Sequence, residues 1–234
     1  MSSPFLKLIQ TGATAEIADA VQADPALASL RDPQGVSMLL WSVYCGQPLV
    51  RDFLLARLAA ESIALDIFEA AATGSEAELW ALLEAEPDLA ESFSGDGWTP
   101  LHLAAAFGTP AAVATLLAVG ASVDDVSRNP QQNQPLHAAL ALSKNIDTVR
   151  LLLDHGAEAN TAQAGGFTPI FSAAIANRRD LAEILLAHGA DPQRKNDQGK
   201  TPADFARERG HAELAAWLES SPARGENGRK YAPH

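Results

Sequence analysis

The chain has 234 residues, of which 47% are hydrophobic, and this is enough apolar material to bury a substantial core. The excess of 29 Asp and Glu residues over 17 Lys and Arg residues gives a formal net charge of −12, which argues against binding to nucleic acid. A single cysteine excludes an internal disulfide framework and a multi-cysteine metal site.

The first half of the chain shows a weak but phased series of helix pairs. Gly12, Gly46 and Gly74 each close a predicted first helix, at intervals of 34 and 28 residues. Because the second interval is short, we expect the second unit to lack a normal hairpin around Ala59–Ala64. Second helices are predicted over Ala15–Ala23, Leu49–Leu58 and Glu76–Ala85.

The second half of the chain repeats one phrase, DGWTPLHLAAAFG at Asp96–Gly108. Altered copies follow at Asn133–Ser143, Gly166–Asn177 and Gly199–Gly210. The prolines of the four copies lie 35, 34 and 33 residues apart. These prolines are Pro100, Pro135, Pro169 and Pro202.

Each copy is predicted to fold as a pair of helices. Thr99 fits an N-cap, and Pro100 fits the first helical residue, where its missing N–H has no cost. Val113 and Leu117 lie on one apolar face of the second helix, four residues apart. Gly120 then ends that helix, as a glycine with positive φ does.

The period of about 33 residues and the T-P-L-H-x-A-A core resemble those of the ankyrin repeat family. The chain resembles a stand-alone array of this family. Its alanine-rich composition favours a bacterial source. The resemblance implies an all-α solenoid of about seven helix-turn-helix units with short connecting hairpins and degenerate N-terminal repeats. We expect one domain over residues 1–220 and a flexible tail over 221–234. The approximate units are 1–33, 34–61, 62–94, 95–129, 130–163, 164–196 and 197–220.

The histidines and the cysteine do not suggest a catalytic or metal site. The resemblance places His102 and His137 in the H of TPLH, where the ring hydrogen-bonds the turn, and His155 and His188 near the carbonyl ends of second helices. Equivalent positions in successive repeats are too far apart to share a metal ion. Cys45 is expected to be a small buried hydrophobe. Since nucleophile-elbow, P-loop and dinucleotide motifs are also missing, we expect no enzyme activity and no cofactor.

One uncharged stretch, residues 97–123, is long enough to span a bilayer. Gly108, Pro110 and Gly120 interrupt it, so a helix pair is the favoured interpretation and we expect no membrane interaction. The N-terminus has no basic leader followed by a long apolar run, and this argues against a signal peptide. We therefore expect a cytoplasmic protein.

Negative charge is concentrated in the middle of the chain. No Lys or Arg occurs between Leu58 and Ser127, a stretch with twelve acidic residues. Such a field would speed association with a partner that has a basic surface and would repel nucleic acid. Alternatively, the glutamates serve only as good surface helix formers, in which case partner affinity would not depend on ionic strength.

The resemblance also implies a binding surface, because ankyrin arrays usually bind through hairpin tips and the exposed ends of first helices, which line a concave groove. Aromatics before the TP step, such as Trp98 and Phe167, often only pack against the next hairpin, so Tyr44 and Phe107 are the better candidates. The candidate residues before the TP step are Val36, Trp98, Asn133, Phe167 and Lys200. Those near the end of the first helix are Tyr44, Phe107, Leu142 and Ile175.

The hairpin over Val126–Gln134 departs from the pattern of the others. It lacks a glycine, and Gln134 replaces the capping Thr. The hairpin is also longer than the others by about one residue. Without glycine a positive-φ turn is costly, so we expect this hairpin to be distorted or mobile, either as a binding tip or through drift.

These observations favour a non-enzymatic module that binds and scaffolds or inhibits a protein partner. One alternative is an acidic mimic that blocks a basic, nucleic-acid-binding protein. Another is a small-ligand carrier or enzyme with a pocket at the irregular second repeat, using Trp41, Tyr44 or Cys45. The oligomeric state is not readable from the sequence.

Overall fold

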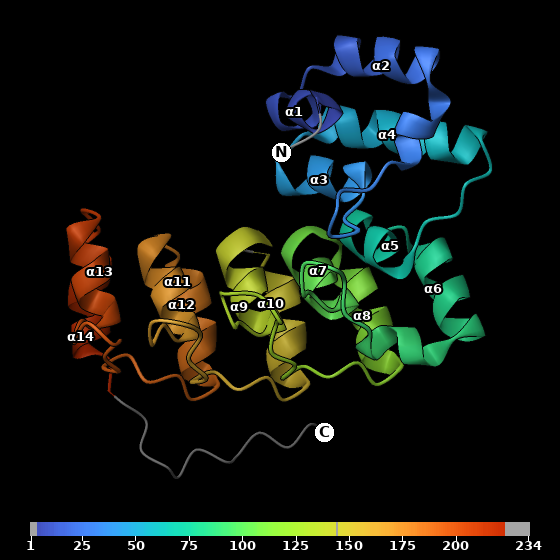
Figure 1. The fold of residues 1–234 in the computed structure, drawn as a ribbon. Helices are drawn as coiled ribbons and strands as arrows, with labels where there is room; N and C mark the ends of the chain where they lie inside the picture. The colour runs from blue at the N-terminus through green and yellow to red at the C-terminus, as the bar shows by residue number, and fades with distance from the viewer. Residues whose placement is uncertain (1–3, 144, 223–234) are drawn as a thin grey trace. The chain divides into compact units, whose positions relative to one another are not determined.

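The computed structural model describes residues 4–143 and 145–222. Over these ranges the chain is helical, and its β pairing consists of two isolated bridges, Arg31 with Ser37 and Gln163 with Phe167. The chain divides into two compact units, unit 1 (Met1–Ser122) and unit 2 (Val123–His234) (Figure 1). The all-α fold class of paired helices is confirmed. The expected flexible tail lies, from residue 223 onward, outside the described residues.

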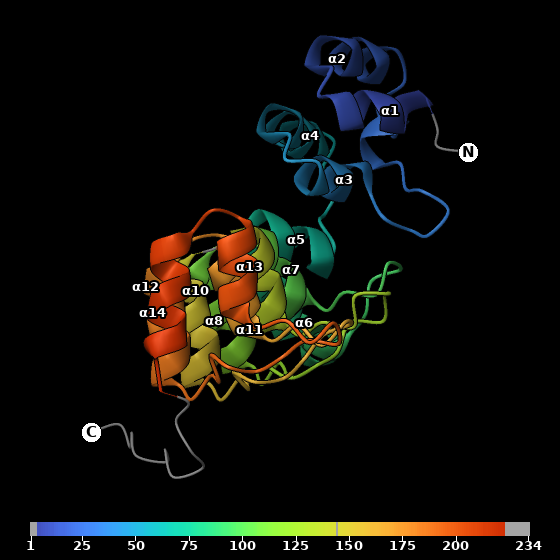
Figure 2. The same ribbon diagram turned by 90° about the vertical axis from the view of Figure 1, so that its left-hand side faces the viewer.

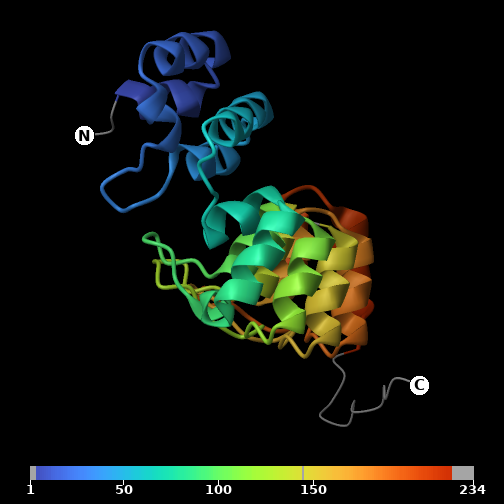
Figure 3. The same cartoon turned by 90° about the vertical axis from the view of Figure 1, so that its right-hand side faces the viewer.

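Unit 1 contains four helix pairs in the order of the chain (Figures 1 and 3). First helices contact first helices along the unit, from α1 through α3 and α5 to α7, while α2 packs on α4 and α6 on α8. Short 3-10 turns, η1 (Pro25–Ser29) and η2 (Pro87–Glu91), follow α2 and α6. The pairs are α1 (Pro4–Thr11) with α2 (Thr14–Ala23), α3 (Met38–Tyr44) with α4 (Pro48–Ala60), α5 (Ile67–Thr73) with α6 (Glu76–Ala85), and α7 (Pro100–Phe107) with α8 (Pro110–Ala118).

The start of α7 shows how the TPLH phrase specifies a helix. The Thr99 hydroxyl accepts the backbone N–H of His102 at 3.3 Å, and the Nδ1 atom of His102 accepts the backbone N–H of Thr99 at 3.4 Å. Pro100 follows as the first helical residue. The predicted N-cap is therefore confirmed. Buried alanines from Ala104 to Ala106 keep α7 thin, which lets α5 pack closely against it.

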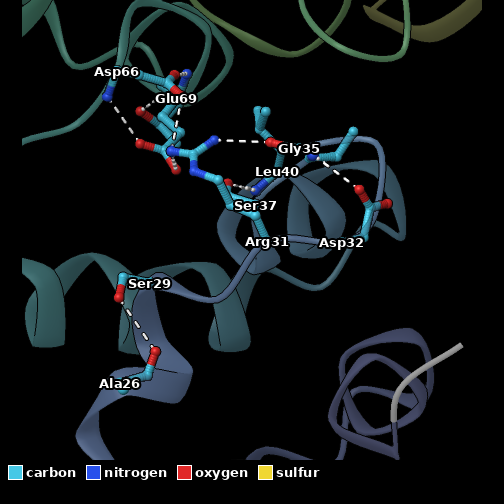
Figure 4. Close-up of polar contacts among 11 residues, drawn as sticks. Ala26, Ser29, Arg31, Asp32, Gly35, Ser37, Leu40, Asp66 and Glu69 are labelled. Carbon is cyan, nitrogen blue, oxygen red and sulfur yellow. Dashed lines mark hydrogen bonds and ion pairs between the residues drawn. The ribbon is translucent and has the colours of Figure 1, made fainter.

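The degenerate third repeat makes the same bonds with carboxylates (Figure 4). Asp66 Oδ1 accepts the backbone N–H of Glu69 at 2.7 Å, and Glu69 Oε2 accepts the backbone N–H of Asp66 at 2.9 Å. The Arg31 guanidinium lies 2.9 Å from Asp66 and 3.2 Å from Glu69. Glu69 is only 4% exposed, and burial, followed by the charge of Asp66, raises the pKa of its carboxyl group.

No hairpin separates α4 from α5, as the short glycine interval predicted. The chain turns between Ala60 and Asp66, with Ser62 at a φ of 54°. Consequently the hairpins of the second and fourth repeats meet directly. A Cβ atom added to Gly95 would lie 1.7 Å from the carbonyl oxygen of Gln34, so this contact has no room for a side chain.

The described residues of unit 2 form three helix pairs, which Figure 2 shows side by side. First helices and second helices again contact their equivalents, as α11 does with α13 and α10 with α12. The pairs are α9 (Pro135–Ala138), continued by η3 (Ala139–Ser143), with α10 (Ile146–Asp154), α11 (Pro169–Ile175) with α12 (Arg179–Ala187), and α13 (Pro202–Glu208) with α14 (Ala212–Ser220).

Two local insertions explain the unequal proline intervals. The Ser127–Asn133 hairpin closes over two more residues than the equivalent Gln163–Phe167 hairpin, and Gln132 takes a positive φ of 47° in place of glycine. The hairpin is thus distorted, as predicted, but by two residues instead of about one. The second insertion is a single residue that widens η3 into a π-helix and leaves Leu142 50% exposed.

No helix within the described ranges is both long enough and apolar enough to cross a bilayer. The uncharged stretch over residues 97–123 folds as the pair α7 and α8, which Gly108 and Thr109 separate. Both helices bury an apolar face against their neighbours in unit 1.

Candidate functional site

The structure brings together two of the candidate residues, Tyr44 and Phe107. Their ring centroids are 5.4 Å apart at an interplanar angle of 38°, and Trp41 packs edge-on against Tyr44 at 5.9 Å. The rings come from α3 and from the end of α7, and α5 contacts both helices. All three rings are half-buried, so together they form one aromatic cluster with an accessible edge.

Carboxylates surround this aromatic cluster. The Trp41 indole N–H donates to Asp32 Oδ2 at 2.9 Å. The Tyr44 hydroxyl is buried close to the Asp96 carboxylate. Burial, followed by the charges of Asp96, Asp66 and Asp32, raises the pKa of Tyr44 far above its usual range. The ring therefore stays protonated at neutral pH in a negative environment.

A shallow open cavity of about 210 Å³ adjoins the aromatic cluster, with Phe107 and Arg51 in its wall. This is smaller than the pockets of roughly 300–1,000 Å³ that hold drug-sized ligands. Cys45, expected to be buried, is only partly buried, and burial raises the pKa of its thiol. A thiol that is protonated at neutral pH is a poor nucleophile, so the arrangement does not favour catalysis.

Comparison with known proteins identifies the architecture. The family model for ankyrin repeats in three copies matches residues 67–163, and the model for ankyrin repeats in many copies matches residues 152–206. This chain is an ankyrin repeat protein. It is similar to the human neurogenic locus notch homolog protein 4, with 32% identity over 151 residues, which are 64% of this chain. The chain spans about 7% of the length of that relative.

The ankyrin repeat family generally mediates protein–protein interaction and is generally non-enzymatic. Both matched ranges begin at α5 or later, so the repeats before residue 67 lie outside them. The helix pairs α1 with α2 and α3 with α4 nevertheless pack in the same alternating manner as the matched repeats. The degenerate N-terminal repeats are therefore defined by structure more clearly than by motif.

The remaining candidates of unit 1 differ in accessibility. Val36 is 3% exposed and lies below the surface at the base of its hairpin. Trp98 is half-buried and packs edge-on against His102, with ring centroids 5.5 Å apart. This contact lies within the repeat of Trp98 itself, so the packing of Trp98 against the next hairpin stays a prediction.

In unit 2, Phe167 and Lys200 meet around Phe205. Phe167 packs edge-on against Phe171 at 5.3 Å and against Phe205 at 5.4 Å. The Lys200 ammonium lies 5.5 Å from the Phe205 ring and 2.6 Å from a Glu208 carboxylate oxygen. The contact of Phe167 with Phe205 joins neighbouring repeats and the others lie within one repeat, so both residues have a packing role.

Three further candidates of unit 2 lie at different depths. Asn133 is 5% exposed, as part of the closure of the distorted hairpin. Ile175 is half-buried at the end of α11, whereas Leu142 is exposed on η3. Of these three candidates, Leu142 and Ile175 are thus the ones that a partner can reach.

The histidines make the structural contacts that the family resemblance implied. Nδ1 of His155 lies 2.8 Å from the Leu151 carbonyl oxygen, at the end of a second helix. Burial lowers the pKa of His137 to about 4, so this ring is neutral at neutral pH. In residues 4–143 and 145–222, no group of three or more His, Cys, Asp or Glu side chains is placed to hold a metal ion.

Sequence reasoning missed one exposed residue, Trp80 of α6. Its ring is 55% exposed, the only aromatic among the exposed large hydrophobic side chains of the described residues. A signal was available, because Trp80 immediately follows the core residue Leu79 in the helical pattern and therefore falls off the apolar face.

Proposed function

We propose that this ankyrin repeat protein is a non-enzymatic module that binds a protein partner and scaffolds or inhibits it. The observation that carries the proposal is the contact between Tyr44 and Phe107, which come from repeats two apart. Half-buried aromatic rings are preferred anchors at protein interfaces, because they bury much area at little conformational cost. Leu142 and Ile175 are the corresponding anchors that we propose for unit 2.

The partner that fits this surface has a basic face. Asp32, Asp66 and Asp96 lie close enough to Tyr44 to affect its pKa, so the aromatic cluster lies in a negative field. Such a field speeds association with a cationic surface and disfavours nucleic acid. We also propose a cytoplasmic location, in keeping with a single free cysteine.

The test is to replace the two contacting rings and follow partner capture. Tyr44→Ala with Phe107→Ala is preferable to aspartate at these positions, since a new carboxylate beside Asp96 would also destabilise the fold. We expect the partner recovered from the source cell with the natural protein to be lost. Circular dichroism should show that the variant stays folded at the assay temperature.

The matched control is Ala212→Ser with Ala216→Ser, two small changes at exposed positions of α14. We expect this control to retain the partner fully. Retention of the partner by the Tyr44 and Phe107 variant as well would rule out the aromatic cluster as its binding site.

The stretch from Ala59 to Val126, which contains no Lys or Arg, supports a second candidate function. In this function the chain is an acidic mimic of nucleic acid. In that case the partner is a nucleic-acid-binding protein, and a DNA duplex would compete with this chain for it. We expect the partner to lose affinity for both ligands as the salt concentration rises, because salt screens charge attraction and removes the gain from counter-ion release on the duplex. A partner that binds this chain equally well with and without excess duplex would exclude the mimic.

A further inference from the structure

Trp80 is an exposed indole that the core of unit 1 does not use. Leu79 and Leu83, on the inner face of α6, are fully buried, whereas Trp80 leaves more than half of its surface exposed. A ring of this size would contribute favourable burial if a partner covered it.

The fold itself does not require a tryptophan at this position. Trp80 is the fifth residue after the N-cap of its second helix, Ser75. The other second helices with the same register have small or charged residues there, and none of these is buried. These residues are Ala114, Arg150, Glu183 and Ala216.

Two carboxylates flank the exposed ring on its own helix. Glu76 and Glu84 lie one turn before and one turn after Trp80, on the same side of α6, and both are exposed. Glu76 also accepts a hydrogen bond from the Thr109 hydroxyl at 3.3 Å. Indole faces attract cations, and carboxylates bind guanidinium groups, so the three side chains offer complementary contacts to one cation.

The protein contains an internal precedent for such a contact. In unit 2 the guanidinium carbon of Arg179 lies 4.8 Å from the ring centroid of Trp217. In the part of the chain that the structure describes, no cation is recorded over Trp80. The contact at Trp217 thus shows that an exposed edge of this fold can seat a guanidinium on an indole ring.

We infer that the outer face of α6, made of Glu76, Trp80 and Glu84, binds an arginine of a protein partner. The guanidinium lies over the indole ring and its N–H groups face the two carboxylates. Arginine fits better than lysine because its planar group both stacks on a ring and bonds carboxylates. This surface adds to the proposed function and does not depend on the aromatic cluster of Tyr44 and Phe107.

The test uses the indole N–H signals of the full chain in a nitrogen–proton NMR spectrum, where four tryptophans give four resolvable reporters. The probe is a glycine-spaced peptide with three arginines, and its control is the same peptide with neutral citrulline. We expect the arginine peptide to shift the Trp80 signal saturably and the citrulline peptide to bind several-fold more weakly. Equal binding of the two peptides, or no shift of Trp80, would overturn the inference.

Matched variants separate this site from general electrostatics. Glu76→Gln with Glu84→Gln should weaken the binding of the arginine peptide roughly two- to fivefold, since each exposed contact contributes modestly. Glu16→Gln with Asp19→Asn makes the same change in charge at exposed positions of α2 and should leave the affinity unchanged. Equal losses in both double variants would show that only net charge matters and would overturn the site.

The chain's own basic residues near its end, which lie outside the described residues, are the competing occupant. Arg224→Ser, Arg229→Ser and Lys230→Ser together remove them. We expect the Trp80 signal of the peptide-free protein to stay where it is in this variant. A shift of that signal, with stronger peptide binding, would assign the site to the chain's own C-terminal segment and overturn the partner. Because the readout is a peptide on α6, it is independent of whether the Tyr44 and Phe107 variant loses its partner.

Discussion

The starts of α5 and α7 make the same pair of hydrogen bonds with different chemistry. At α7 the buried residues Thr99 and His102 form the pair without formal charge. At α5 Asp66 and Glu69 form it, and the Arg31 guanidinium contacts both carboxylates. The comparison teaches that a repeat can lose its motif and retain its geometry, provided that another part of the chain neutralises the new charges.

The largest expected effect comes from removing that neutralising cation. Arg31→Met leaves Glu69 buried beside Asp66 without a counter-charge, and we expect the free energy of unfolding to fall by about 2 kcal/mol. This is below the 3–5 kcal/mol of a fully buried pair, because Arg31 is partly exposed. Chemical denaturation at neutral pH measures the change.

The control for Arg31 is Arg57→Met, which removes the partly exposed pair with Glu61 on α4. We expect a loss of about 0.5 kcal/mol or less from this control. If the two variants lose the same stability, the charged start of α5 is no more demanding than a surface ion pair.

The next effect tests the contact that replaces the missing hairpin. An alanine at a compatible glycine position usually stabilises a protein by about 0.4–1 kcal/mol. At Gly95 the new Cβ would meet the carbonyl oxygen of Gln34, so we expect Gly95→Ala to destabilise instead, by about 1.5 kcal/mol. The sign of the change in the denaturation midpoint shows whether the alanine is compatible with this position. A more stable variant would show that the two hairpins do not need this close approach.

Removing the neutral cap of α7 should have a smaller effect than removing Arg31. Thr99→Ala leaves the backbone N–H of His102 without its hydroxyl acceptor, and we expect a loss of about 1 kcal/mol. Thr99→Ser keeps the acceptor and serves as the control, with an expected change close to zero. An alanine variant as stable as the serine variant would mean that the TPLH cap contributes little beyond its proline.

The difference between the two helix starts also marks how far the sequence predicted the structure. TPLH is readable because its bonds join residues three positions apart, and the D-x-x-E of Asp66 and Glu69 was equally readable as a capping box. The contact of Arg31 with these two carboxylates was not readable, because Arg31 precedes them by 35 and 38 residues and reaches them only through the loss of a hairpin. The unequal proline intervals likewise showed that some repeats contain extra residues. They did not show that one of these residues lies in η3.

The candidate site shows the same limit. Sequence pattern identified Tyr44 and Phe107 singly, as residues near first-helix ends, but their contact depends on how α3, α5 and α7 pack. Val36 and Asn133 occupy equivalent sequence positions to Trp98 and yet are buried, because the depth of a position before the TP step depends on how its own hairpin closes. Motif position thus predicts the side of a repeat and not the exposure of the residue on it.

The smallest expected effect is a dependence on pH at the charged start of α5. Burial raises the pKa of Glu69 above its ordinary value of 4.5, so the folded state binds its proton more tightly than the unfolded state. The stability that this proton contributes is complete below the ordinary value and is lost as pH rises through the raised one. Glu69→Gln lacks this titration, so its stability relative to the natural protein should increase between about pH 4.5 and neutral pH. Denaturation of both proteins across this range measures the difference. A constant gap between the natural protein and Glu69→Gln would show that Glu69 titrates alike in the folded and unfolded states.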